Sequence, residues 1–440
     1  MPTPHVVVVG GGFAGTACAC ALADRGLRVT LLERREALGG RAWSFPDPEF
    51  GAELDNGQHL VIGAYRQTLA LLERLGTRSG IVLQDRLAVP LCDLRSGAHI
   101  LVSARGVRGL PWREQAGLFR VLLALRGLGP QPDDSMSVAD WLDRCRQSRR
   151  ACELLWEPLA VATLNQEPRV ASSALLAAVL KSALADRAAG ARLGAARIGL
   201  SQLLAGVGPY LAQRGGTLRT ESPVSRLLYA DDRAAGVLVR GAEELRAHAV
   251  VLAVPPRALA ALVPAFSELP ARLGSSAIVS IHLGFDRPLA GVWLLGLVGS
   301  PIHWVFRVPS DPSRLCLVSS AADALAERDP DALVALALSE LERALPLGGA
   351  RLRAARVIKE HEATISHAVG TLARRPDVDS EVAGLFLAGD YTSTGLPATL
   401  EGAVQSGLRA AALSSAFARL RPPGAARGRS RAESAPRSAP

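Results

Sequence analysis

The feature that most restricts how this chain can fold is a glycine turn between two regular segments near its start. Residues 6–9 are four valines in a row, which is typical of a strand buried on both faces of a parallel sheet. Gly10, Gly12 and Gly15 follow in a G-x-G-x-x-G pattern, and the alanine-rich residues 16–25 predict a helix. A Cβ atom on these glycines would block the tight turn and the approach of a pyrophosphate to the backbone. The sequence therefore predicts a dinucleotide site, with the anion on free N–H groups at the helix start.

An acidic residue comes next. Glu33 ends the second predicted strand, residues 27–32, at the distance expected of a carboxylate that holds a ribose hydroxyl. Arg34 and Arg35 would favour a ribose 2′-phosphate, and so NADP, but Glu33 would repel that phosphate. A glycine turn that binds no nucleotide is the remaining alternative.

A second glycine pair favours one of these nucleotides. Gly39, Gly40 and Arg41 lie just past the acidic residue, and such a pattern resembles the FAD-binding extension of amine oxidases and carotenoid desaturases. Arg41 also has the donor geometry to neutralise a pyrophosphate. We therefore predict FAD rather than NAD(P) as the cofactor.

The length of the chain allows two domains. Its 440 residues, 49% of them hydrophobic, can form two separate cores. We predict an α/β fold in which a Rossmann-like FAD-binding domain, of GxGxxG plus GGR type, is combined with a discontinuous α+β substrate-binding domain. The FAD-binding domain is predicted from residues 1–79, 196–259 and 376–420, the substrate-binding domain from 80–195 and 260–375, and a disordered basic tail from 421–440.

Motifs further along the chain resemble a known family. Residues 55–59, Asp-Asn-Gly-Gln-His, place polar side chains around a glycine, and residues 385–390 form an apolar strand that ends in Gly-Asp. With residues 39–41 and 156–165, they resemble the squalene-associated FAD-dependent desaturases, or hydroxysqualene dehydroxylases, of the amine oxidase and carotenoid desaturase superfamily. The resemblance covers nearly the whole chain except the tail.

This resemblance implies which residues hold the cofactor. Asp390 would hold the ribityl chain or the pyrophosphate, and Val224 would hold the adenine through its backbone. Pro397 would mark a helix start whose N–H groups face the pyrimidine oxygen of the flavin, where they stabilise negative charge. The predicted cofactor contacts are Gly10, Gly12, Phe13, Ala14, Gly15, Glu33, Arg34, Arg35, Gly39, Gly40, Arg41, Asn56, Gly57, Gln58, Val224, Gly389, Asp390, Pro397, Thr399 and Leu400.

The resemblance also implies a reaction, the reductive dehydroxylation of the C30 isoprenoid hydroxysqualene to squalene by hydride from reduced FAD. An unidentified reductant would then have to reduce the FAD again. His59 is the first candidate for the acid that protonates the leaving hydroxyl, and Gln58 or Asn56 would orient the leaving oxygen. The alternative is that these three residues only shape the flavin pocket.

Three other functions share these motifs. A carotenoid or phytoene-type desaturase would oxidise a polyene. An amine oxidase or protoporphyrinogen oxidase would share the nucleotide domain, but no lysine lies near the C-terminal motif, since Lys359 comes well before it. A prenyl-lipid carrier that resembles the Rab-escort proteins would bind no flavin and would be colourless.

The charge of the chain bears on its partners. The net charge of +9 comes almost entirely from arginine, which favours acidic surfaces such as anionic lipid headgroups. Nucleic acid is not expected, because no basic stripe is interleaved with stacking aromatics. Residues 111–128 predict either an interfacial helix that dips into a membrane or an ordinary helix buried against the core.

The remaining expectations concern location. No secretory signal precedes the first strand, and no apolar run reaches the length that spans a bilayer. The six cysteines have no metal-ligand spacing, so we expect reduced thiols and no metal site. We predict a cytoplasmic protein, peripheral on the inner face of the membrane.

Overall fold

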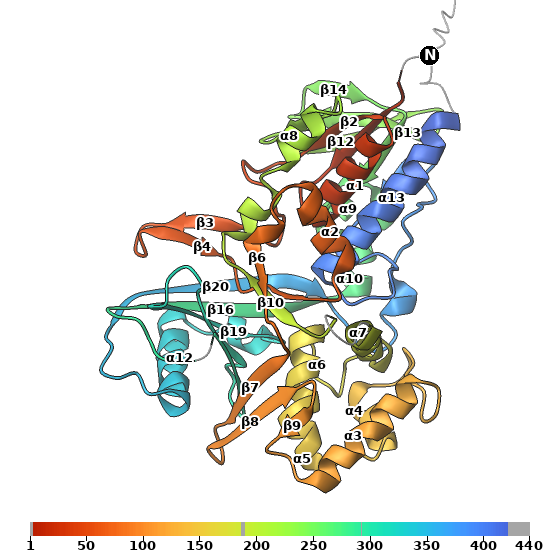
Figure 1. Cartoon of the computed structure of the whole chain (residues 1–440). Coiled ribbons are helices and arrows are strands. Elements are labelled where there is room, and N and C mark those ends of the chain that lie inside the picture. Colours follow the sequence, from red (N-terminus) through yellow and green to blue (C-terminus); the bar gives the residue numbers. More distant parts are fainter. Residues whose placement is uncertain (1–2, 186–189, 292, 421–440) are drawn as a thin grey trace, which may run out of the picture.

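A parallel sheet of five strands forms one end of the molecule (Figure 1). The computed structural model describes residues 3–185, 190–291 and 293–420, so the predicted tail lies outside the described residues. The strand order is β11-β2-β1-β15-β21, and every neighbouring pair is parallel. In that order the strands are Thr217–Arg219, Arg28–Leu32, His5–Val9, Ala249–Leu252 and Leu385–Leu387. The prediction of a buried parallel strand at β1 is confirmed.

Successive valines of β1 face opposite sides of this sheet. Val6 and Val8 pack on the side that carries two helices, α1 (Phe13–Asp24) and α13 (Leu400–Leu420). Figure 1 shows α13, in blue, beside α1, in red. The two helices approach closely because Gly407 has no side chain: a Cβ there would lie 2.1 Å from the carbonyl oxygen of Ala14. Segments from the two ends of the chain are therefore brought together.

The other side of the sheet, to which Val7 and Val9 point, is covered by a three-stranded meander and two short helices. Neighbouring strands of the meander are antiparallel. Its elements are β12 (Val224–Ala230), β13 (Arg233–Val239) and β14 (Glu243–Arg246), with α9 (Pro256–Leu262) and α10 (Leu269–Leu273) beside them.

An eight-stranded sheet forms the middle of the molecule, with β16 and β20 running across it in Figure 1. Its strands come from residues 88–108 and 275–365, and the division of the chain into the two predicted domains stays a prediction. In sheet order they are β20 (Leu352–Ile365), β16 (Ser275–Phe285), β19 (Arg314–Ser319), β18 (Trp304–Arg307), β17 (Leu294–Val298), β7 (Ala88–Asp93), β8 (Ala98–Ser103) and β9 (Gly106–Arg108).

Helices pack on both faces of this sheet and form two apolar clusters. On one face the fully buried Trp141 anchors α4 (Val138–Arg144). Ser137 caps this helix, since its Oγ accepts a hydrogen bond from the N–H of Asp140 at 3.1 Å. The helices of this face are α3 (Trp112–Leu125), α4 (Val138–Arg144), α5 (Arg149–Ala151), α6 (Glu157–Leu164) and α7 (Ser173–Ala185), and those of the other are α11 (Asp323–Ala326) and α12 (Pro330–Ala344).

Shorter elements connect the two large sheets. Helix α2 begins at Arg66, and Glu401 of α13 caps it by accepting hydrogen bonds from the N–H groups of Gln67 and Thr68 at 3.0 and 2.9 Å. The connecting elements are β3 (Ser44–Asp47), β4 (Ala52–Asp55), β5 (Leu60–Ile62), α2 (Arg66–Arg74), β6 (Ile81–Leu83), β10 (Leu193–Ala196) and α8 (Val207–Ala212).

Asn165 ties α6 to the middle sheet. It ends α6 in the left-handed conformation, with φ 47°. Its Nδ2 donates to the carbonyl of Ser276 and to Oγ1 of Thr364, both at 3.0 Å, and its Oδ1 accepts from the N–H of Ala321 at 2.6 Å. The side chain is therefore a structural anchor, and all its bonds are made within the protein.

Replacing this anchor should destabilise the fold. We expect Asn165→Leu to lower the free energy of unfolding by about 3 kcal/mol, because it leaves buried polar partners unsatisfied and keeps the strained φ. Urea denaturation measures this change. The control is Gln213→Leu at the end of α8, which is exposed and should change the value by less than about 0.5 kcal/mol. Equal stability of the two variants would contradict the anchoring role.

Candidate cofactor and active site

The two glycine segments of the N-terminal region lie side by side. The N–H of Gly39 donates to the carbonyl of Gly11 at 3.0 Å, and Gly12 and Gly39 form a parallel bridge. Gly15 permits the close contact of α1 with the turn, because a Cβ there would lie 1.9 Å from the carbonyl oxygen of Gly10. The first turn of α1 carries no acidic side chain and its N-cap makes no side-chain bond. Its backbone N–H groups are therefore suited to an anion.

Glu33 and the strand that begins at Val224 meet at one end of these turns. The carboxylate of Glu33 accepts from the N–H of Gly11 at 2.7 Å and of Arg35 at 2.9 Å. The backbone carbonyl of Glu33 accepts from the N–H of Ser222 at 2.8 Å, two residues before Val224. Arg34 and Arg35 are exposed. The structure thus brings Glu33 close to Val224, as an adenosine site at this end would require.

Arg41 and Asp390 join the beginning and the end of the chain in an ion pair. Asp390 follows β21 and its side chain is 8% exposed, whereas that of Arg41 is 33% exposed. Arg41 also donates to the carbonyl of Ala363 at 3.0 Å. Its own carbonyl accepts from Nδ2 of Asn56 at 2.8 Å. Four segments far apart in the sequence therefore meet at this pair.

The turn after β21 is held by α13. Oγ of Ser406 accepts from the N–H of Gly389 at 3.0 Å. Helix α13 begins at Leu400, and Thr399 caps it by accepting from the N–H of Gly402 at 3.2 Å. The expectation that the helix starts at Pro397 is wrong, because Pro397 lies in the preceding turn and the hydroxyl of Thr399 supplies the cap.

Two buried basic residues beside Asp390 were not predicted. Nε2 of His367 accepts from the N–H of Ala398 at 2.8 Å, and its Nδ1 contacts the carbonyl of Leu164. Arg375 donates to the carbonyl of Leu396 at 2.6 Å, but its Nε and Nη2 atoms are buried without a partner in the described part of the chain. Burial lowers the pKa of Arg375 to about 10, against the opposing effect of Asp390 and Asp134.

Buried histidines make the stability of the protein depend on pH. Burial lowers the pKa of His5, His282 and His367 from 6.5 to about 4. The unfolded chain therefore takes up protons first as the pH falls from 6.5 towards 4, and the free energy of unfolding falls over that window. We expect a loss of roughly 2 kcal/mol per histidine between pH 7 and pH 5.

Denaturation at the two pH values checks this expectation. His367→Gln should lower the stability at pH 7 yet reduce its pH dependence, because one of the buried titrating histidines is gone. His361→Gln, at an exposed position, is the matched control for the substitution itself. Equal free energies of unfolding at pH 7 and pH 5 would contradict the neutral, buried state of these histidines.

Residues 55–59 lie against the middle sheet. A Cβ on Gly57 would lie 2.6 Å from Oγ of Ser280, so this loop packs directly on β16. His59 is half-buried, and its Nδ1 lies 3.1 Å from the carbonyl of Gly57. Burial lowers the pKa of His59 below 6.5, although hydrogen bonding to Gly57 and the charge of Asp55 oppose the shift. At pH 7 its neutral form therefore predominates.

The two predicted partners of His59 differ in their surroundings. The side-chain amide of Asn56 donates to Arg41, and its Oδ1 accepts from the N–H of Trp43 at 3.3 Å. Asn56 is therefore engaged in holding Arg41. Gln58 is half-buried beside His59, which leaves it as the better candidate to orient a leaving oxygen.

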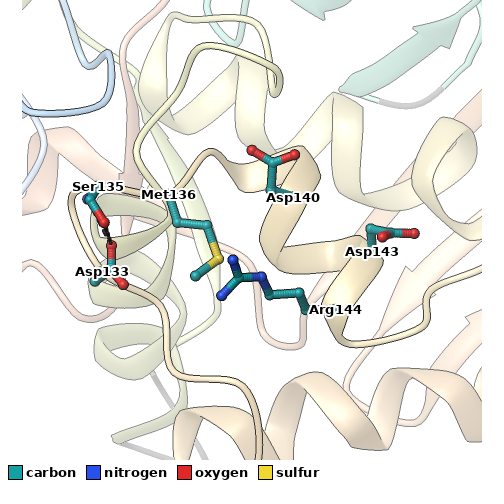
Figure 2. Close-up of a pocket in the computed structure, with 6 residues that line it drawn as sticks. All are labelled: Asp133, Ser135, Met136, Asp140, Asp143 and Arg144. Atoms are coloured by element: carbon teal, nitrogen blue, oxygen red, sulfur yellow. Dashed lines mark hydrogen bonds between the residues drawn. The ribbon is translucent and has the colours of Figure 1, made fainter.

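Two cavities lie away from these residues. The first, of ≈ 270 Å³, is lined by Asp133, Ser135, Met136, Asp140, Asp143 and Arg144. In Figure 2 the guanidinium of Arg144 extends towards Met136, while the carboxylate of Asp143 points away from that guanidinium. The second, of ≈ 560 Å³, is lined by residues of β12 and by Ala261, Leu262 and Pro264. None of the predicted cofactor contacts lines either cavity. Among the described residues, no cluster of His, Cys, Asp and Glu could hold a metal ion.

The residues near Asp390 suit a flavin dinucleotide. The free N–H groups of α1 fit a pyrophosphate, and the carboxylate of Glu33 retains lone pairs for ribose hydroxyls. The Nε and Nη2 atoms of Arg375 and the hydroxyl of Tyr391 are buried without partners in the described part of the chain. Buried groups of this kind are expected to gain partners when a polar ligand binds.

The comparison with known families supports a flavin at this site. The sequence pattern of the family described as flavin containing amine oxidoreductase matches residues 13–413. The chain belongs to this family. As an amine oxidoreductase family member it is a flavin-dependent oxidoreductase, and the predicted resemblance is confirmed.

Three relatives show which enzymes of the amine oxidoreductase family this chain is similar to. Hydroxysqualene dehydroxylase of Rhodopseudomonas palustris is 32% identical, over 93% of this chain and 97% of its own. The enzyme of the same name from Sinorhizobium fredii is 31% identical, over 93% and 98%. The 15-cis-phytoene desaturase of Synechococcus elongatus is 27% identical, over 92% and 94%. The chain thus belongs with the hydroxysqualene dehydroxylases of the family.

Solved structures show the same fold. A putrescine oxidase variant, from a redesign of cofactor binding, has a TM-score of 0.75 at 20% identity, over 94% of this chain and 99% of its own. An oxidoreductase from Methanosarcina mazei has a TM-score of 0.73 at 16% identity, over 92% and 99%. The predicted α/β fold of the amine oxidoreductase type is confirmed. Among the described residues, no helix is long and apolar enough to cross a membrane.

Proposed function

We propose that the protein binds FAD and converts hydroxysqualene to squalene. The observation that carries this proposal is the 32% identity to a hydroxysqualene dehydroxylase over 93% of the chain. The convergence of Glu33, Arg41 and Asp390 on one site supports FAD as the flavin, because two phosphates and a ribose must be held along with the ring. The predicted cofactor contacts, with the roles that the family resemblance implies for them, are part of this proposal.

The chemistry places simple demands on the chain. An allylic alcohol loses its hydroxyl as water, so the carbon–oxygen bond breaks with uptake of a proton, and a carbon–hydrogen bond forms with uptake of a hydride. Bound FAD in its reduced form supplies the hydride, and a separate reductant must restore it. The chain must therefore hold a proton near the hydroxyl and keep other nucleophiles away from the carbon.

The face of the middle sheet that carries α4 to α7 has the apolar character that such a substrate needs. Trp304 and Phe306 of β18 and Val318 of β19 are buried in the apolar cluster of that face. Loop 55–59, which contains His59, packs on β16 of the same sheet through the contact of Gly57 with Ser280. An apolar lining of this kind is what a C30 hydrocarbon would need.

His59 is the proposed proton donor. Its pKa is lowered by burial, so the protonated fraction and with it the rate of squalene formation should rise as the pH falls below 7. We expect His59→Ala to lower the rate about a hundred-fold while the flavin content stays normal. His361→Ala, at an exposed position of β20, is the control. An unchanged rate and pH profile in His59→Ala would remove His59 from the chemistry.

Incubation with two substrates tests the proposal against its alternatives. The protein is mixed without oxygen with reduced flavin and hydroxysqualene, and separately with oxidised flavin and phytoene. We expect squalene in the first mixture alone. Desaturated phytoene in the second would favour the desaturase, a function that the 27% identity to phytoene desaturase keeps open. A colourless protein that takes up no flavin would favour the prenyl-lipid carrier.

A further inference from the structure

Helix α3 turns large apolar side chains towards solvent. Trp112 is 73% exposed, Phe119 65% and Leu123 41%, although Val121 and Ala124 of the same helix are fully buried. Residues 112, 119 and 123 are spaced by seven and four positions, so they share one face of the helix. Leu128, just past the helix, is 69% exposed. Helix α3 is therefore buried against the core on one face only, and its other face is exposed to solvent.

Arginines lie around this exposed face. Arg113, Arg120 and Arg126 are exposed, and none of them forms an ion pair within the described part of the chain. The guanidinium of Arg113 lies 5.5 Å from the centre of the Trp112 ring. Residues 105–126 contain five arginines and only one carboxylate, that of Glu114, whose Oε2 atom is buried. The exposed charge of this segment is therefore mainly positive.

The position of α3 leaves this face accessible. Figure 1 shows α3 at the end of the molecule opposite to β2 and β14, so a flat surface could approach it without reaching the glycine turns. The helix is packed from behind by α4 and by the neighbouring sheet through the apolar cluster that contains Val121 and Trp141. The exposed face thus belongs to a helix whose opposite face is packed in the protein, and not to a loop.

We propose that the α3 face, defined as Trp112, Phe119 and Leu123 with Arg113, Arg120 and Arg126, docks on a membrane that contains anionic phospholipids. Tryptophan and other large apolar side chains insert at the boundary between headgroups and acyl chains. Arginine binds phosphate through two parallel hydrogen bonds. A second copy of the chain is a poorer occupant, because the arginines of the two α3 faces would then oppose each other.

Vesicle sedimentation tests this docking with the flavin-loaded protein. We expect the protein to sediment with vesicles of phosphatidylcholine mixed with phosphatidylglycerol, to bind pure phosphatidylcholine at least ten-fold more weakly, and to be released by salt. The double variant Trp112→Ser with Phe119→Ser and the double variant Arg113→Gln with Arg120→Gln should each reduce binding at least ten-fold. Retained flavin absorbance and an unchanged melting temperature verify that both variants are folded.

The matched control removes exposed apolar side chains elsewhere. Val82→Ser with Tyr229→Ser alters residues that are 54% and 48% exposed on other elements, and should bind vesicles like the unmodified protein. Equal binding by the α3 variants, or no binding to any vesicle, would overturn the proposal. So would a concentration-dependent dimer that the Trp112 and Phe119 changes abolish, because the occupant would then be a second copy. None of these readouts depends on the substrate, so the docking and the proposed reaction can fail separately.

Discussion

Gly15→Val is expected to abolish flavin binding and, with it, activity. An ideal Cβ at position 15 lies 1.9 Å from the carbonyl oxygen of Gly10 and 3.0 Å from Cβ of Ala253. The obstructing oxygen is part of the backbone, so it cannot rotate away as a flexible side chain would. Either α1 moves away from the turn or the turn itself opens, and both remove N–H groups from the pyrophosphate position. The ratio of visible to ultraviolet absorbance after purification measures the bound flavin.

The matched control for this variant is Gly117→Ala in α3. A Cβ at position 117 meets nothing within 4 Å. Alanine in a helix interior is favoured over glycine by roughly 0.5–1 kcal/mol, so this variant should keep its flavin and gain slightly in stability. Normal flavin content in Gly15→Val would contradict the assignment of this turn to the cofactor.

The second large effect is expected from Asp390→Ala. Removing one partner of a fully buried ion pair costs about 3–5 kcal/mol, and we expect a smaller loss here because a third of the Arg41 side chain is open to solvent. The proposed contact of Asp390 with the cofactor is lost as well. We therefore expect the affinity for flavin to fall more than about ten-fold, a loss of over about 1.4 kcal/mol in binding. Flavin titration by fluorescence quenching measures the affinity.

An exposed pair of the same kind provides the control. Asp377 pairs with Arg409 at 2.9 Å, and both side chains are about half exposed. Asp377→Ala should leave flavin content unchanged and lower stability by about 0–1 kcal/mol. Arg41→Gln should resemble Asp390→Ala, and the two changes together should cost less than their sum, because they remove the same contact. Additive losses would show that the pair does not act as a unit.

The parts of the fold that the sequence predicted are those set by neighbouring residues. The valines of β1 and the glycines behind them each contain the whole signal within about ten residues. The Ser137 cap is equally local, since it acts on the N–H of Asp140. For such features the residue type alone fixes the backbone conformation or the bond.

The features that could not be predicted from the sequence depend on contacts between residues that are far apart in the chain. Gly407 allows α13 to lie on α1, Glu401 caps α2, and Arg375 is buried beside Asp390, yet each partner lies more than a dozen residues away. A signal did exist for one of them: a glycine in the middle of a long helix pattern often marks a close helix contact. Nothing local shows that Asn165 points into the protein rather than towards a ligand, and only its three buried bonds decide this.

The exchange of electrons between bound flavin and hydroxysqualene tests the central claim most directly. The purified protein is reduced without oxygen, freed of excess reductant and mixed with hydroxysqualene, while flavin absorbance and squalene are followed together. We predict that the oxidised flavin band returns and that squalene forms in equal molar amount. A flavin that stays reduced in the presence of hydroxysqualene, with no squalene formed, would contradict the account.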